Sequence, residues 1–255
     1  MRTATVPLLL SLAPSLASAG TQAGAQPPKP SVEAQERLEE LAVEVDLFVQ
    51  DWRKSMQDKA KEGSQAIAMR PDFTVFVDRL LAWADESGGE DAALYLTQVV
   101  QLDGLAKESK GVECLDRLLR DHPRSSSWAR LGRYLTTLER SVGEERKDEI
   151  LEVLGKSPDA DVRGWVALAR HSKTVESAPR DSQEYAAARK ALLAAAAEVR
   201  DATLRDELEG PIDLREKLGV GAQAPDIEGV DLDGVAFKLS EYKGKVVFLD
   251  FWGDW

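Results

Sequence analysis

Residues 219–255 read GVGAQAPDIEGVDLDGVAFKLSEYKGKVVFLDFWGDW, and this stretch differs in pattern from everything before it. Asp233-Gly234 is typical of a tight turn, because glycine adopts positive φ angles without steric cost. After this turn, residues 235–240 alternate apolar with small or polar side chains, a period of two that predicts a half-buried strand. A second turn is predicted at 242–245. The apolar run at 246–252 then predicts a strand buried on both faces, as in the middle of a parallel or mixed sheet.

The same stretch resembles the opening of a thioredoxin-like redoxin domain. Residues 221–226, GAQAPD, are similar to the G-x-x-A-P-x start of these domains, and 231–240 are similar to their D-x-x-G…F-x-L-S hairpin. Residues 242–251 resemble the family's Y-K-G-K-x-V-x-L-x-F strand. Residues 251–255 resemble F-W-A-x-W, with Gly253 where alanine is usual. The motifs follow one another in the order and at the spacing of the family.

The resemblance implies a function as well as a fold. In the family a Cys-x-x-Cys motif comes next, so the catalytic dithiol is expected directly after Trp255 and the domain is expected to be truncated just before it. A tryptophan at Trp255 favours the TlpA-like thiol-disulfide oxidoreductases, and a peroxiredoxin of the AhpC/TSA type is the alternative. A dithiol at a helix N-terminus is reactive because the helix dipole stabilises its thiolate. The resemblance thus implies dithiol exchange with protein thiols and disulfides, without a cofactor.

The composition is that of an acidic globular protein. The 255 residues include 45 acids and 33 bases, which gives a formal net charge of −12, and 43% are hydrophobic. An apolar share of this size can fill a core. The negative charge argues against nucleic acid and anionic membrane surfaces as partners, because binding to phosphates needs a basic face.

Residues 1–19 have the features of a secretory signal peptide. A basic start is followed by a short apolar stretch at 6–16 and by Ala17-Ser18-Ala19, which fits a cleavage site, with a second possible site at 23–25. The apolar stretch is shorter than the ~20 residues of a membrane span, and no later stretch reaches that length. We therefore expect export to the bacterial periplasm or cell envelope. The proline-containing residues 20–30 predict a flexible linker.

Residues 31–218 predict a series of helices joined by short loops, so the expected fold class is mainly α. The first helix, at 31–62, has Ser31 as its expected N-cap and Gly63 as its expected end. Its apolar stripe has helical spacing and fits packing against the following helices or, as the alternative, a coiled-coil seam for a partner. The stripe consists of Leu38, Leu41, Val45, Phe48, Trp52 and Met56.

The remaining helices have lengths that favour stacked antiparallel hairpins, as in a repeat-like α-solenoid, or a bundle. The last helix is expected to be interrupted at Gly210-Pro211. The helical region would then bind or position a protein partner. If the β segment has no redox role, the alternative is a non-catalytic, exported helical-repeat interaction protein. The next helix is expected to open at 69–72 and to end at 87–89, and a short helix is expected after Lys110-Gly111, ending at 121–123. The other expected helices cover 90–105, 128–138, 144–154, 161–170, 181–200 and 203–218.

Outside the last segment, few residues could carry chemistry. Cys114 is the sole cysteine, and its place on the apolar face of a predicted helix predicts burial. His122 and His171 each fall at a predicted helix end, where the dipole favours a cation, and two isolated histidines with one cysteine make no zinc site. Asp121 and His122 lie close to the serines at 125–127, but no nucleophile elbow accompanies them, and the serines are candidate helix caps. No residue of the chain is therefore assigned a catalytic, cofactor-binding or metal-binding role.

Overall fold

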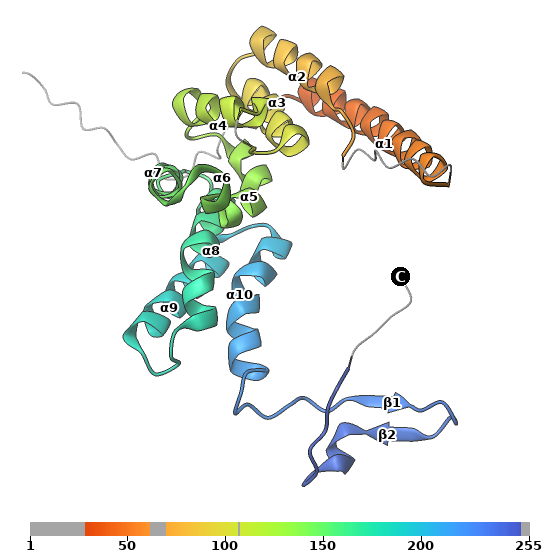
Figure 1. The fold of residues 1–255 in the computed structure, drawn as a ribbon. Coiled ribbons are helices and arrows are strands. Elements are labelled where there is room, and N and C mark those ends of the chain that lie inside the picture. The colour runs from red at the N-terminus through yellow and green to blue at the C-terminus, as the bar shows by residue number, and fades with distance from the viewer. Residues whose placement is uncertain (1–28, 62–69, 107, 251–255) are drawn as a thin grey trace, which may run out of the picture.

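A computed structural model describes residues 29–61, 70–106 and 108–250 of the chain (Figure 1). The predicted signal peptide, most of the linker and the expected helix end at Gly63 lie outside these residues, as do 251–255. Within the described ranges the chain is mainly helical, as the sequence predicts, with ten α-helices, two 3₁₀ helices and one small two-stranded sheet.

Most helices begin close to where the sequence predicts. Polar side chains accept hydrogen bonds from the free N–H groups at several helix starts, which stabilises these ends. Ser31 accepts from the N–H of Ala34 at 3.1 Å, so its predicted role as an N-cap is confirmed. The bounds are α1 Val32–Lys61, α2 Thr74–Glu86, α3 Gly89–Asp103, α4 Lys110–Asp121, η1 Ser126–Leu131, α5 Gly132–Thr137, α6 Glu139–Val142, α7 Glu144–Leu154, α8 Ala160–Ser177, α9 Gln183–Glu198 and α10 Ala202–Lys217.

The helices stack in sequence order along one direction (Figure 1). Helix α3 packs between α2 and α4, η1 packs against α3, and both η1 and α5 pack against α8. Helix α8 then packs against α9 and α10. Consecutive helices therefore pack together in α2, α3 and α4 and again in α8, α9 and α10, whereas η1 packs back on α3 and α5 packs on α8, so the described helices form one continuous helical assembly.

The apolar core consists of two clusters that meet at α8. The first extends from α1 to α8 and contains Trp128, which is completely buried. The second joins α8, α9 and α10. Trp165 packs against both clusters, and its ring lies so close to Gly132 that a Cβ atom added there would be 2.0 Å away. The missing side chain of Gly132 therefore allows α5 and α8 to approach closely.

Three expectations about the helices are wrong in detail. The helix expected at 128–138 is instead a 3₁₀ helix followed by two short α-helices, η1, α5 and α6. Helix α8 continues to Ser177 rather than ending at 170, because Val175 is completely buried in the second cluster. Helix α10 continues through Pro211 without interruption, because Leu208 and Ile212 on either side of it are buried against the same cluster.

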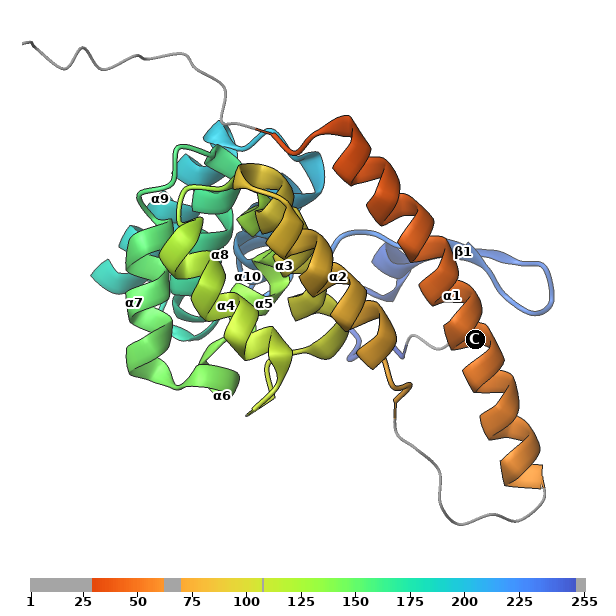
Figure 2. The same cartoon turned by 90° about the horizontal axis from the view of Figure 1, so that it is seen from above.

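Helix α1 packs on the rest of the molecule from its start as far as Phe48, and its C-terminal end points away from the other helices (Figure 2). Ala34, Leu38 and Leu41 are buried, whereas the later members of the predicted stripe are half-buried. Phe48 contacts α2 and the residue before it, with ring centroids 5.3 Å from Phe76 and 6.2 Å from Phe73. The predicted packing against the following helices is therefore confirmed for the stripe from Leu38 to Phe48.

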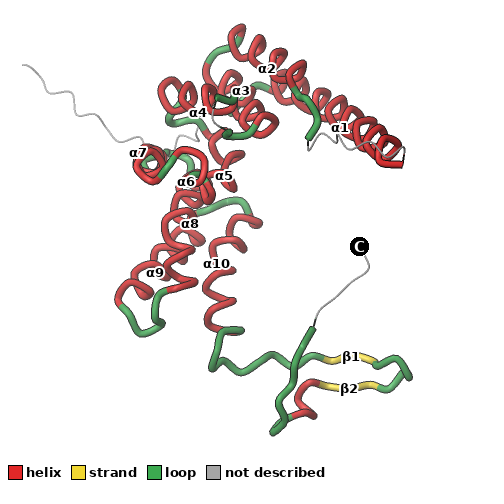
Figure 3. The backbone as a smooth tube through the Cα atoms, viewed as in Figure 1, coloured by secondary structure: helices red, strands yellow, loops and turns green. Residues whose placement is uncertain are grey.

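The C-terminal segment forms a β-hairpin that stands apart from the helices (Figure 3). Strand β1 Glu228–Val230 pairs antiparallel with β2 Ala236–Lys238, and the 3₁₀ helix η2 Leu239–Tyr242 follows. The strand expected at 246–252 is not formed over its described residues 246–250, which are extended without a paired strand. The expected burial is also wrong there, because no described element covers this stretch and Val246 and Phe248 are 103% and 91% exposed.

Candidate functional site

The hairpin that carries the family motifs is held at its base by Asp226 and Ser240. The Asp226 carboxylate accepts a hydrogen bond from the Ser240 backbone N–H at 2.7 Å and another from the Ser240 hydroxyl at 2.8 Å. These two hydrogen bonds hold the pKa of Asp226 below its usual range. The N–H of Leu239 donates to the carbonyl of Ile227 at 2.9 Å and extends the pairing of the strands in the same place. The start of the segment is thereby tied to the residues after β2.

The turn of the hairpin is built on Asp231. Its carboxylate accepts hydrogen bonds from the N–H groups of Asp233 and Val235, each at 2.9 Å. Gly234 has a φ of 81°, a conformation that glycine adopts without strain, so the turn predicted at Asp233-Gly234 is confirmed. The aspartate and the glycine of the D-x-x-G motif therefore both have a structural role.

One face of the hairpin is partly covered by the ring of Phe237, whereas the other face is exposed to solvent. Phe237 lies opposite Gly229 across the strands, and its ring would be 3.1 Å from a Cβ atom added to Gly229. Both residues are half-buried, while the neighbours Ala236 and Lys238 are exposed. The ring of Phe237 thus covers the space above the glycine, which compensates for the missing side chain.

A second turn follows η2 and directs the chain back along the hairpin. The N–H of Lys245 donates to the carbonyl of Tyr242 at 3.1 Å, and Gly244 has a φ of 84°. The turn predicted at 242–245 is therefore confirmed. Beyond it, Val247 and Leu249 are 41% and 47% exposed, far less than the residues that alternate with them. These two side chains line a cavity of about 450 Å³ with residues 223–226 and η2.

The polar side chains of the hairpin stabilise its own structure. Asp231 accepts hydrogen bonds in the turn, Asp226 accepts them at the base, and Glu228 forms a cross-strand ion pair with Lys238. The sequence predicted the hairpin but not the tie between Asp226 and Ser240. The pairing of an aspartate after Ala-Pro with a serine after Phe-x-Leu is the pattern that could have indicated it.

Cys114 lies in α4 and is 2% exposed, so its predicted burial is confirmed. Burial raises the pKa of its thiol to about 12. At neutral pH the side chain is therefore a protonated thiol, which is neither a nucleophile nor a metal ligand.

The two histidines and the polar residues near His122 lie at positions where they support the helices. His122 follows α4, as expected, whereas His171 lies inside α8 rather than at its end. Both are half-buried, and burial lowers the pKa of each. Asp121 pairs with Arg120 at 2.9 Å, and Ser125 accepts from the N–H of Ser127, as predicted for a cap.

Over the described ranges, no group of three or more His, Cys, Asp or Glu residues is arranged to hold a metal ion. Among the helices of these ranges, none combines the length and the apolar character that a membrane span requires.

Comparison with known proteins gives short but clear matches. The chain is 43% identical over 47 residues to the thiol-disulfide oxidoreductase ResA of Bacillus cereus, which is 18% of this chain and 27% of the relative. It is 53% identical over 38 residues to the protein of the same name from Geobacillus kaustophilus, which is 15% of this chain and 22% of the relative. These relatives are thiol-disulfide oxidoreductases. The chain spans about a quarter of the length of the curated relatives it matches.

No protein-family model matches the chain, and no solved structure matches it. The comparisons therefore relate the chain to thioredoxin-like redox proteins over a short segment.

Proposed function

We propose that residues 219–255 form the N-terminal part of a thioredoxin-like redoxin domain, in a protein that carries out thiol-disulfide exchange. The observation that carries this proposal is the series of family motifs from Gly221 to Trp255. The alignments with the ResA relatives cover 47 and 38 residues, a length similar to that of this segment. The hairpin adds support, since it leads into an extended apolar stretch at 246–250 where such a domain has a buried strand.

The chemistry would take place on a dithiol that follows Trp255. One thiolate attacks the disulfide of a protein substrate, forms a mixed disulfide and releases a thiol, and the second thiol then resolves the mixed disulfide. Cys114 takes no part in this reaction, because it is buried and its pKa is about 12. Residues 219–250 would provide the frame for the domain, and the helical region at 31–218 would bind or position the protein substrate.

The N-terminal residues indicate the compartment in which the protein would act. Residues 1–19 have the pattern of a secretory signal peptide, which would direct the protein to the periplasm or cell envelope. Disulfides form and persist in such compartments, so thiol-disulfide exchange on protein substrates has a place there.

Sequencing the coding DNA beyond codon 255 tests the proposal directly. We expect codons for Cys-x-x-Cys immediately after Trp255. A single cysteine preceded by a loop with proline and threonine would identify the peroxiredoxin alternative. A stop codon, with Trp255 as the last residue of the native protein by mass spectrometry, would refute the catalytic proposal and favour the helical interaction protein.

An activity assay provides the second test. The complete protein should reduce the disulfides of insulin, and replacement of the first cysteine after Trp255 by serine should abolish turnover, because that thiol is the nucleophile. The matched control is Cys114→Ser, which should retain the turnover of the folded protein. Turnover that depended on Cys114 would contradict the assignment.

A further inference from the structure

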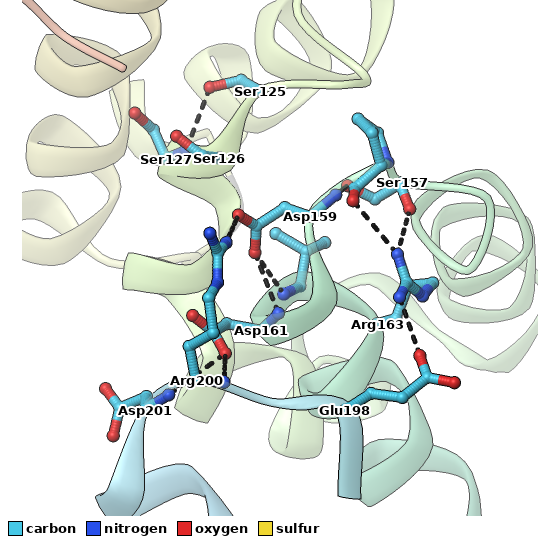
Figure 4. Close-up of polar contacts among 12 residues, drawn as sticks. Ser125, Ser126, Ser127, Ser157, Asp159, Asp161, Arg163, Glu198, Arg200 and Asp201 are labelled. Atoms are coloured by element: carbon cyan, nitrogen blue, oxygen red, sulfur yellow. Dashed lines mark hydrogen bonds and ion pairs between the residues drawn. The ribbon is translucent and has the colours of Figure 1, made fainter. Parts of the chain in front are cut away.

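A pocket of about 500 Å³ lies where the helix starts of the stack meet, far along the chain from the hairpin. The region contains Ser126 and Ser127 of η1, the start of α8 and the loop between α9 and α10 (Figure 4). Its wall also includes Pro30, Leu94 and Ala129, which give it an apolar part. A cavity of this size can hold a small organic molecule or the end of a peptide.

The carboxylates that line the pocket are already engaged. Asp159 accepts from the N–H groups of Asp161 and Val162, at 2.9 and 3.1 Å, and its other oxygen pairs with Arg200 at 2.6 Å (Figure 4). Asp161 accepts from the N–H groups of Arg200 and Asp201, at 2.8 and 3.3 Å. Asp201 accepts from the backbone N–H of the third residue after it, at 3.1 Å. All three acids lie at helix starts, where the dipole offsets part of their charge.

Two of the positively charged side chains that line the pocket have fewer partners than its carboxylates. Among the described residues, Arg130 and Lys29 have no carboxylate within ion-pair distance. The nearest acceptor for the Arg130 guanidinium is the neutral side chain of Gln98, at 3.4 Å. The side chain of Arg130 is exposed at the rim, and partial desolvation lowers its pKa. At the rim of the pocket, therefore, a cation has no counterion among the residues that the structure describes.

Ser127 provides a second, independent observation. It is 3% exposed, it lines the pocket, and its hydroxyl has no hydrogen-bond partner in the described part of the chain. A buried hydroxyl without a partner is unfavourable, and such groups in folded proteins usually meet a partner or a ligand. The hydroxyl oxygen itself is covered, so rotation about the Cα–Cβ bond, which needs no movement of the backbone, is the step by which it would donate to a ligand in the pocket that the residue lines.

We propose that this pocket binds a carboxylate carried on an apolar body, with Arg130 and Ser127 as donors and Pro30, Leu94 and Ala129 as the apolar wall. A carboxylate offers two acceptor oxygens, which matches a guanidinium and a hydroxyl. The carboxylate could come from a free organic acid or from the C-terminus of a peptide. This inference does not depend on the proposed redox function, because it concerns the helical region alone.

Titration of the full chain with benzoate, followed by the backbone NMR signals of Ser127 and Arg130, tests the proposal. We expect saturable shifts at both residues, and little effect from benzylamine, which has a similar ring and the opposite charge. In the second arm, N-acetyl-Ala-Phe with a free carboxylate is compared with its C-terminal amide. Tighter binding of the peptide acid than of benzoate would identify a peptide terminus as the source, and the reverse would identify a free acid.

Variants then assign the donors. Arg130→Gln should weaken binding at least roughly tenfold, because it removes a charge-assisted hydrogen bond. The matched control is Arg133→Gln, since the side chain of Arg133 is 78% exposed and pairs with Glu207 outside the pocket. Ser127→Ala should also weaken binding. If Arg130→Gln does not fold, benzamide replaces the variant, because it removes the charge from the ligand instead.

Three outcomes would overturn the inference. One is the absence of saturable shifts with benzoate and with the peptide acid at about 10 mM. Another is equal binding of the acids and of their uncharged amides. The third is unchanged affinity of Arg130→Gln in a folded protein.

Discussion

Asp226 and Ser240 form a two-point contact that closes the base of the hairpin, with hydrogen bonds of 2.7 and 2.8 Å. The contact joins two of the motifs that resemble the redoxin family, the one at 221–226 and the one at 231–240. The strands between them are short, each with three residues, so much of the order of this segment depends on this contact and on the turn at Asp231.

Loss of the Asp226 contact should open the hairpin. In Asp226→Asn the charge that strengthens both hydrogen bonds is removed, so we expect faster amide hydrogen exchange at Leu239 and Ser240 with no change in the helices.

The contact between Asp226 and Ser240 should also depend on pH. Because the pKa of Asp226 is lowered from 3.8, the contact is fully present above that value and is lost as the pH falls through the lower pKa of the folded form.

NMR spectra recorded between neutral pH and pH 2 would check this dependence at about one-unit steps. The control is Glu241→Gln, an exposed acid in the neighbouring 3₁₀ helix. Equal exchange rates in Asp226→Asn and in the unmodified protein would contradict the prediction.

The close contact between Gly132 and Trp165 predicts a large effect of a small substitution. A Cβ atom at Gly132 would lie 2.0 Å from the ring, so Gly132→Ala should force α5 and α8 apart and lower the free energy of unfolding by about 1–3 kcal/mol. Urea unfolding monitored by circular dichroism would measure it. Gly88→Ser is the control, because nothing lies within 4 Å of its added Cβ and serine is a good N-cap. A Gly132→Ala variant as stable as the control would show that the ring moves aside freely.

Burial of Cys114 predicts slow chemistry and a specific pH dependence. The thiol should react with Ellman's reagent only as fast as the protein opens, and at once in denaturant. Its pKa is raised from 9.0 to about 12, so the unfolded chain loses this proton first as the pH rises. The stability that comes from the neutral thiol is therefore present below pH 9 and is lost between pH 9 and about 12.

Comparison with Cys114→Ala isolates that contribution. The variant should be less stable near neutral pH, because it leaves a small cavity, and its stability should fall less steeply above pH 9 than that of the unmodified protein. Urea unfolding at several pH values measures both slopes. If the free energy of unfolding fell equally steeply with pH in the variant and in the unmodified protein, or if the folded protein were labelled rapidly, the burial of the thiol would be contradicted.

Much of the helical part could be predicted from the sequence, and the failures have physical causes. The bounds of α7, Glu144–Leu154, agree with the expected ones because a glycine lies at each end, Gly143 and Gly155, and the apolar residues between them have helical spacing. The continuous α10 was missed because packing of Leu208 and Ile212 outweighs the local effect of Pro211. Residues 246–250 have strand propensity but lie beside no paired strand, and strand formation needs a partner. The pocket beside Ser127 could not be predicted, because its lining comes from five separate stretches of the chain.

Asp159 should contribute more to stability than an ordinary helix cap. It caps α8, its side chain is 5% exposed, and it pairs with Arg200 from the loop before α10. Asp159→Ala should lower the free energy of unfolding by about 2–4 kcal/mol, because it removes the cap and leaves Arg200 unpaired. Asp201→Ala, which removes only the exposed cap of α10, should cost about 1 kcal/mol. Similar losses in the two variants, measured by urea unfolding, would show that the pair with Arg200 adds nothing.

In a polypeptide of residues 1–255, the exposed stretch at 246–250 should cause self-association. Val246 and Phe248 project an apolar edge into solvent without a paired strand, which is the usual starting point for edge-to-edge association. We expect concentration-dependent association in sedimentation velocity experiments, reduced by Phe248→Lys without loss of helical stability, because this side chain is 91% exposed. Val75→Lys is the matched control, since Val75 in α2 is 74% exposed on a helix and offers no free strand edge. The two variants should unfold at the same urea concentration, so that any difference in association comes from the edge. Equal association of Phe248→Lys and the unmodified protein would place the contact elsewhere, and slow amide exchange across 246–250 in a monomer would show that the stretch is already protected within one chain.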